Sequence, residues 1–147
     1  MHARRATRHP MEQMMSNNMK IALVTGATRG IGLETVRQLA AAGVHVLLAG
    51  RDAGRAEQAA LQLSKAGLPV ESVTLDITSP ASIAAAVVEV TRNFGRLDIL
   101  VNNAGVFIDD FAKTPSEQSL DTWRSTFDTN LFGVVAATQA FMPLLRK

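Results

Sequence analysis

From Lys20 onward, short apolar runs alternate with longer stretches of helical periodicity, and this alternation limits the fold more than any other feature of the 147-residue sequence. Each apolar run has five or six residues, the length of a strand buried on both faces of a parallel sheet. The runs are residues 21–25, 44–49, 70–75 and 97–101. With right-handed crossovers, the order βαβαβαβ predicts an α/β, Rossmann-like doubly wound parallel sheet.

The segments between these runs carry apolar residues on one helical face and have recognisable ends. Gly43 and Gly67 follow the first two expected helices, and Ser79-Pro80 places a capping hydroxyl before proline at the first helical position of the third. After residue 101 we expect a loop of about fifteen residues. A long helix capped by Ser119 should then run from Leu120 to the end, with an apolar stripe. The stripe consists of Leu120, Trp123, Phe127, Val134, Ala137 and Phe141.

The first run leads directly into Thr25-Gly26-Ala27-Thr28-Arg29-Gly30-Ile31-Gly32 and then into a helix. In this pattern Gly26 permits a tight turn, Gly30 lets the backbone approach a pyrophosphate, and Gly32 lets helix and strand pack closely. The N–H groups at the start of the helix can then hold the anion. We interpret the segment as a dinucleotide-binding loop, because the strand–turn–helix context that the motif requires is present.

About twenty residues further on, where an NAD site would carry an acid, stand Gly50 and Arg51. A guanidinium at this place suits the 2′-phosphate of NADP(H), and Arg29 in the first loop can reach the same group. Asp52 argues for NAD(H), although its place before residues 53–66 favours a helix cap. The sequence therefore predicts a preference for NADP(H), with NAD(H) as the alternative.

Polar residues end two further expected strands. Asp76 can accept from an adenine amino group at the ligand crevice, or it can be a turn residue before Ser79-Pro80. Asn102 and Asn103 can tie strand ends together while Ala104 and Gly105 leave room for a ribose, or they can form a plain turn. Both alternatives stay open at each place.

Asn130 falls on the apolar stripe of the long helix, three residues after Phe127 and four before Val134. A buried amide there has to find hydrogen-bond partners. From spacing alone, a structural role such as satisfying a kink is favoured over catalysis.

Composition and charge exclude several other classes. The sequence has no Cys and three His, which removes thiolate catalysis, disulfides and Cys-based metal sites and fits a reducing, cytoplasmic compartment. Residues 1–20 hold four of the 15 basic and one of the 13 acidic residues, which leaves 11 basic against 12 acidic in residues 21–147. A basic groove for nucleic acid is therefore not expected, nor is a membrane anchor, and residues 1–18 are expected to be a disordered extension.

Four motifs, Thr-Gly-x-x-x-Gly-Ile-Gly at 25–32, Leu-Asp-Ile at 75–77, Asn-Asn-Ala-Gly at 102–105 and Thr-Asn-Leu-Phe-Gly at 129–133, resemble the short-chain dehydrogenase/reductase family. Within this family, the Ala-Gly-Arg-Asp turn at 49–52 and the overall spacing of the motifs are similar to those of NADPH-dependent carbonyl reductases and related oxidoreductases. The resemblance implies strand order 3-2-1-4-5-6-7, and hydride transfer between NAD(P)(H) and a small carbonyl or alcohol substrate. It also implies that Asp76 contacts adenine and that Asn130 belongs to a catalytic Asn-Ser-Tyr-Lys tetrad. The residues expected at the cofactor are Thr25, Gly26, Arg29, Gly30, Ile31, Gly32, Arg51, Asp76, Ile77, Asn103, Ala104 and Gly105.

The sequence departs from the family pattern in its second half. It contains no Tyr, so the Tyr-x-x-x-Lys pair of the family is not matched. The sequence also ends at residues 142–147, where the family's fifth strand and catalytic Ser would be expected to follow. We therefore expect residues 19–147 to be the dinucleotide-binding part of a truncated enzyme, with a non-catalytic NADP-binding sensor or partner subunit as the alternative. Residues 97–101 would then form an unpaired edge, and the chain would aggregate or pair with another chain, including a second copy, through that edge.

Overall fold

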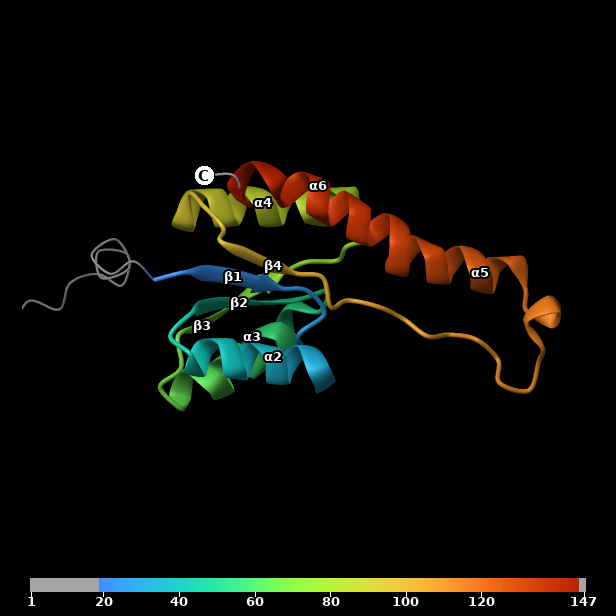
Figure 1. The fold of residues 1–147 in the computed structure, drawn as a ribbon, viewed down its shortest axis with the longest axis horizontal. Helices are drawn as coiled ribbons and strands as arrows, with labels where there is room; N and C mark the ends of the chain where they lie inside the picture. Colours follow the sequence, from blue (N-terminus) through green and yellow to red (C-terminus); the bar gives the residue numbers. More distant parts are fainter. Residues whose placement is uncertain (1–18, 146–147) are drawn as a thin grey trace, which may run out of the picture.

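The computed structural model describes residues 19–145, which form a four-stranded parallel sheet with helices on both faces (Figure 1). The strands are β1 (Ile21–Val24), β2 (His45–Gly50), β3 (Val70–Thr74) and β4 (Ile99–Val101). Their order is β3-β2-β1-β4, and every pairing is parallel. The predicted α/β, Rossmann-like fold is confirmed, whereas the expectation for residues 1–18 lies outside the described residues.

Two helical layers enclose the sheet (Figure 1). One layer contains α2 (Gly30–Ala41) and α3 (Ala53–Lys65), and the other contains α4 (Pro80–Phe94) and α6 (Val134–Leu145). Because side chains alternate along a strand, neighbouring strand residues enter opposite layers. Leu23 packs in the core beneath α4 and α6, while Val24 packs in the core of α2 and α3.

The expected helix ends are confirmed where a side chain or a glycine defines them. The Asp52 carboxylate accepts a hydrogen bond from the Arg55 N–H, and the Ser79 and Ser119 hydroxyls accept in the same way at α4 and at the helix that begins at Leu120. Gly43 and Gly67 follow α2 and α3 with positive φ. Local sequence therefore fixes where these helices begin and end.

Burial on both faces holds for β1 and β2 but is wrong for the outer strands. Every residue of β1 and β2 is buried, whereas Glu71 and Thr74 of β3 are exposed and all of β4 is half-buried. The reason is position, because β3 and β4 are the two edges of the sheet and neighbours cover them on one side only. Apolar character predicted strands here, but it did not predict where they lie in the sheet.

The long helix predicted from Leu120 onward is present as a continuous helical run to Leu145, but it is not a uniform α-helix. The chain forms α5 (Leu120–Phe127), a π-helical segment η2 (Asp128–Gly133) and then α6. Ala137 and Phe141 are buried against the sheet, while Leu120, Trp123 and Phe127 are exposed, because α5 extends beyond the end of the sheet (Figure 1). The predicted stripe therefore contacts the core only in its second half.

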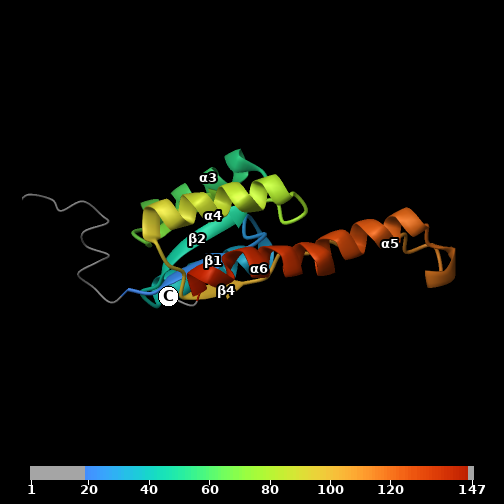
Figure 2. The same ribbon diagram turned by 90° about the horizontal axis from the view of Figure 1, so that it is seen from above.

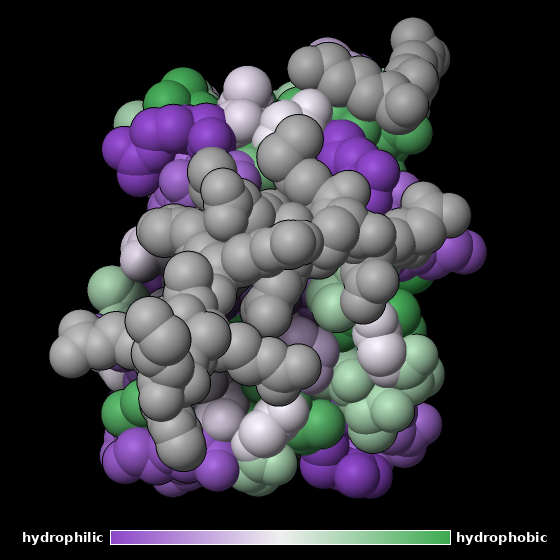
Figure 3. Space-filling view, turned by 90° about the vertical axis from the view of Figure 1, so that its left-hand side faces the viewer, coloured by the Kyte–Doolittle hydropathy of each residue, from purple (hydrophilic) through white to green (hydrophobic). Residues whose placement is uncertain are grey.

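Residues 106–133, here called the arm, extend beyond the end of the sheet (Figures 1 and 2). The arm exposes large apolar side chains, among them Phe107 at 67% and Phe111 at 88% of their surface, and their rings pack against each other. At the opposite end, where β1 begins, hydrophilic and hydrophobic side chains alternate around the described surface (Figure 3). The exposed apolar surface is thus concentrated on the arm.

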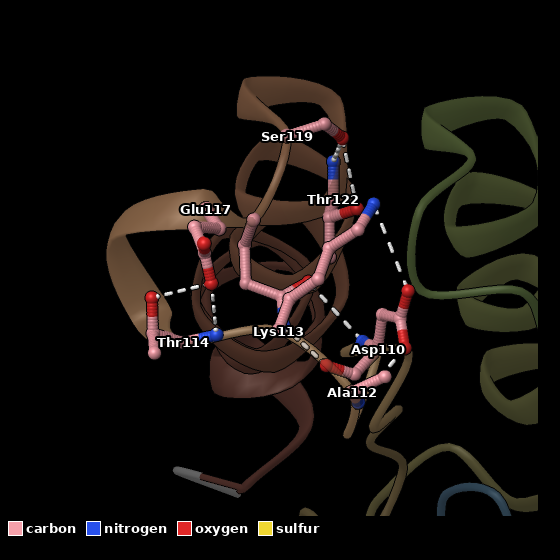
Figure 4. A network of polar contacts seen from close by, with 8 residues as sticks. Asp110, Ala112, Lys113, Thr114, Glu117, Ser119 and Thr122 are labelled. Atoms are coloured by element: carbon pink, nitrogen blue, oxygen red, sulfur yellow. Dashed lines mark hydrogen bonds and ion pairs between the residues drawn. The ribbon is translucent and has the colours of Figure 1, made fainter.

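Short-range polar contacts organise the tip of the arm around η1 (Pro115–Glu117) (Figure 4). The N–H and hydroxyl of Thr114 both donate to the Glu117 carboxylate at 2.8 Å, and these bonds hold the pKa of that carboxyl below its usual range. Gln118 accepts from the backbone N–H of Asp110 and donates to its carbonyl. The tip is therefore locally ordered without being packed against the core.

The exposed apolar arm leads to a prediction about self-association. Phe111→Lys and Phe132→Lys, both in the arm, should shift the 147-residue chain towards monomer, because burying apolar surface yields about 25 cal/mol per Å² and the charge opposes that burial. Size-exclusion chromatography with light scattering measures the outcome. Val88→Lys is the matched control, since Val88 is exposed on the outer face of α4. A monomeric wild-type chain, or equal effects of all three substitutions, would contradict the prediction.

Candidate functional site

A cleft of about 360 Å³ lies at the carboxyl ends of the four strands. The chain leaves β1 towards β2 on one side, while β4 pairs with the other side of β1, so the crossovers diverge at this point. Most of the predicted site residues line the cleft together, although they come from distant parts of the sequence. These lining residues are Gly26, Arg29, Gly30, Ile31, Gly32, Arg51, Asp76, Ile77, Asn103, Ala104 and Gly105.

Thr25 lies beneath the cleft and does not line it. Its hydroxyl, which is buried, accepts hydrogen bonds from the N–H groups of Asn103 and Ala104 at 3.1 and 3.0 Å. The Asn103 amide in return donates to the carbonyls of Thr25 and Gly26, both at 3.0 Å. These four bonds join the end of β1 to the segment after β4, as expected for an asparagine that ties strand ends.

Asn102 points the other way and donates to the Thr138 hydroxyl on α6 at 3.0 Å. The two neighbouring asparagines therefore secure the end of β4 in two directions, one to β1 and one to the helical layer. The plain-turn alternative does not account for these side-chain contacts.

The glycine loop brings backbone close to backbone. Gly26 has φ +61°, and a Cβ there would lie 2.7 Å from the Ala104 Cα, while a Cβ on Gly32 would collide with the Asn103 amide. Gly30 has φ +59° and open space where a side chain would be. The expected roles of Gly26 in the turn and of Gly32 in close packing agree with this geometry.

The start of α2 is suited to an anion. Arg29 precedes the helix without a side-chain cap, and the first turn contains no acidic residue. Its N–H groups, at Gly30, Ile31 and Gly32, therefore remain available as donors at the positive end of the helix dipole. A diphosphate fits this place because the open side of Gly30 lets it approach the backbone.

Gly50 sits where three segments of the cleft meet. A Cβ there would lie 2.5 Å from the Thr28 Cγ2 and 3.4 Å from the Ala56 Cβ. A carboxylate side chain at position 50 therefore has no room without displacing Thr28. The place of the ribose-binding acid expected in an NAD site is closed by packing.

Three arginines line the cleft around this point: Arg29, Arg51 and Arg55. Arg55 was missed from the sequence, although its position three residues after the capping Asp52 places it in the first turn of α3. Five further lining residues belong to the motifs and positions considered from the sequence: Thr28, Gly50, Asp52, Leu75 and Thr129. Thr78 and Val106 also line the cleft, and only the fold brings them there.

Asp76 adopts the turn arrangement and also lines the cleft. One carboxylate oxygen accepts from the N–H and the hydroxyl of Thr78 at 2.9 and 2.7 Å, which is the turn arrangement. The Thr78 bonds, and to a smaller extent the nearby charge of Arg51, hold the pKa of Asp76 below its ordinary value. Asp76 therefore presents an ionised carboxylate at the cleft, and its contact with adenine stays a prediction.

Asn130 lies in the π-helical segment and clamps the loop after β4. Its Oδ1 accepts from the Val106 N–H and its Nδ2 donates to the Val106 carbonyl, both at 2.7 Å. The residue is exposed, so the expected buried amide is wrong, but the expected need for partners is met. This two-point contact supports the structural role and positions Gly105, whose added Cβ would lie 3.4 Å from Asn130 Oδ1.

A second hollow of about 830 Å³ follows the outer face of α2, lined by Gly30, Ile31, Glu34, Thr35, Gln38 and Leu39. It shares only the start of the helix with the cleft and contains none of the arginines or asparagines. Its volume is larger, but the groups that can recognise a nucleotide gather in the cleft. Separately, none of the helices within residues 19–145 is both long and apolar enough to cross a membrane.

A parallel sheet with this strand order, and a glycine turn that opens a helix N-terminus at the divergence of the crossovers, define a dinucleotide-binding protein of the Rossmann class. The chain belongs to the short-chain dehydrogenase family, whose model matches residues 20–147.

Individual relatives agree with this assignment. The short-chain dehydrogenase anuI of Penicillium roqueforti (strain FM164) is 39% identical over 128 residues, which cover 86% of this chain and 50% of that protein. Actinorhodin polyketide ketoreductase, solved with NADPH, superposes with a TM-score of 0.77 at 35% identity, covering 84% of this chain and 46% of its own. Gluconate 5-dehydrogenase from Burkholderia cenocepacia J2315, solved with NADP and tartrate, superposes with a TM-score of 0.78 at 32% sequence identity. The match covers 84% of this chain and 48% of that chain. The chain spans about half the length of each of these three relatives.

The clamp by Asn130 can be tested directly. Asn130→Leu should accelerate hydrogen exchange of the Val106 amide and lower the free energy of unfolding by about 1 kcal/mol, because two backbone groups lose their partners to water. Amide-resolved exchange and urea unfolding measure both effects. Asn93→Leu on α4 serves as the control, and unchanged exchange at Val106 in Asn130→Leu would show that the clamp is not formed in solution.

Proposed function

We propose that this chain binds NADP(H) for an oxidoreductase that transfers a hydride between the cofactor and a small carbonyl or alcohol substrate. The observation that carries the proposal is the meeting of the glycine turn and three arginines in one cleft at the carboxyl ends of the strands. The two solved relatives described above, which hold NADPH and NADP, support it. NAD(H) is the weaker alternative, because position 50 has no room for a carboxylate.

The chain's own residues would divide the cofactor between them. The first turn of α2 would bind the diphosphate, Arg29 and Arg51 the 2′-phosphate, and Asp76 with Ile77 the adenine. Asn103, Ala104 and Gly105 would border the ribose on the nicotinamide side. When bound, NADPH supplies the hydride.

Asn130 would contribute to this reaction as a positioning residue. Beyond its contacts with Val106 it keeps one N–H and one oxygen lone pair, and such groups can order a water near the cleft. This water-holding part is what its resemblance to the family tetrad assigns to it. The proton donor of that tetrad is a tyrosine, and the 147 residues contain none.

We further propose that residues 19–147 are the dinucleotide-binding part of a larger catalytic domain. Three surfaces of the described residues are open: the unpaired outer edge of β4, the apolar arm and the hollow beside α2. An adjoining parallel strand with helices on both faces would cover all three. The relatives, which are about twice as long as this chain, support this assignment.

We also propose a cytoplasmic location, because a sequence without Cys fits a reducing compartment.

A second candidate is nucleotide binding without turnover, as in a sensor or a partner subunit. The observation that favours it is the lack of tyrosine in the chain. Adding NADPH and a broad set of aldehydes and ketones to this polypeptide tests the second candidate, because loss of the reduced cofactor would contradict it. Tight binding without turnover is expected from a sensor and equally from the dinucleotide-binding part of an enzyme whose tyrosine is not among these residues.

The cofactor preference gives the direct test. Arg29→Ala and Arg51→Ala should each weaken NADPH binding by about 1–3 kcal/mol while hardly changing NADH binding, because each removes a charged hydrogen bond to the 2′-phosphate. Titration calorimetry with both nucleotides measures this difference. Arg92→Ala on α4 is the control, and equal losses for NADPH and NADH would refute the phosphate role.

A further inference from the structure

Resting on the proposed NADP(H) site, we infer that Asp52 and Arg55 act as an opposed pair that sets how strongly the cleft prefers a 2′-phosphate. Arg55 favours the phosphate and Asp52 disfavours it. The inference therefore extends cofactor selection beyond the glycine turn and Arg51 to these two residues.

The packing around Gly50 brings together the three segments that carry the cleft's arginines. Gly50 contacts Thr28 and Ala56 so closely that an added Cβ would meet both side chains. Arg51 follows Gly50, Arg29 follows Thr28 and Arg55 precedes Ala56 in the sequence. Each of these three positions is next to an arginine in the sequence, and all three arginines line the cleft.

Asp52 binds Arg55 through both of its oxygens. Oδ1 accepts from the Arg55 N–H at 2.9 Å as the cap of α3, and Oδ2 lies 3.9 Å from Arg55 Nε. Both side chains are largely exposed, so the ion pair is loose and the guanidinium keeps donors for another anion. The carboxylate thus positions Arg55 by the backbone bond while competing for its charge.

The charges of the cleft show why this pair matters. Its lining has three positive groups, Arg29, Arg51 and Arg55, against two negative ones, Asp52 and Asp76. Loss of Arg55 would remove the positive excess, and loss of the Asp52 charge would enlarge it. A 2′-phosphate, which carries up to two negative charges, responds to that balance, whereas a ribose hydroxyl does not.

The test compares two adenine nucleotides, adenosine 2′,5′-bisphosphate and adenosine 5′-monophosphate, on the full 147-residue chain. The ratio of their dissociation constants isolates the 2′-phosphate. We expect Arg55→Gln to lower the preference by about 5-fold and Asp52→Asn to raise it by about 3-fold, the size of exposed charge interactions. The double variant should return the ratio close to that of the wild type, since it removes one charge of each sign.

Asp52→Asn keeps the helix cap, because an asparagine oxygen also accepts from the Arg55 N–H. Lys65→Gln, in the last turn of α3, is the control for loss of a positive charge on the same helix. About 0.5 M salt should reduce all of these differences, which a purely structural effect would not show.

The outcomes separate this inference from the proposed function. A wild-type chain that binds neither nucleotide, or prefers the monophosphate, overturns both. A wild-type preference for the bisphosphate that Arg55→Gln changes no more than Lys65→Gln overturns only the inference. A lower preference in Asp52→Asn would likewise overturn it, because the carboxylate would then be assisting the phosphate.

Discussion

The hydrogen bonds between Thr25 and the segment after β4 hold the site together. One buried hydroxyl satisfies two backbone N–H groups, and the Asn103 amide satisfies two carbonyls in return. Three of the four bonds are partly buried, and a buried polar group left without a partner costs about 1–3 kcal/mol. The junction therefore fixes the glycine turn against Ala104, which in turn sets where the N-terminus of α2 points. The cleft is a consequence of this junction.

A second constraint, the lack of space at Gly50, acts on the other side of the cleft. Thr28 occupies the space that a side chain at position 50 would need, and Ala56 packs beside it, so selection of the ribose substituent passes to the residues next to these contacts in the sequence. Packing therefore favours a 2′-phosphate over a ribose hydroxyl, because position 50 is closed to a carboxylate while three arginines line the same cleft. The same contact brings the first turn of α3 into the site, which is why Arg55 belongs to it.

Much of this arrangement could be predicted from the sequence, and the exceptions have physical reasons. The glycine turn, the caps at Asp52, Ser79 and Ser119, and the parallel sheet depend on local patterns that carry over directly into structure. The π-helical segment does not, because Asn130 and its partner Val106 are far apart in sequence and only the fold joins them. The apolar runs did not predict the exposure of β3 and β4, because exposure depends on which strands are edges. The strand order was implied only by the family resemblance, and the sheet has that order in its four strands.

The most direct test of the account is an amide-resolved NMR titration of the chain with NADP⁺. Binding at the cleft predicts shifts at the first turn of α2, at Arg51 and at Asn103, with unchanged signals at Gln38 and Leu39 on the outer face of the same helix. Shifts centred on Gln38 and Leu39, with Arg51 and Asn103 unaffected, would place the nucleotide in the larger hollow and contradict the account.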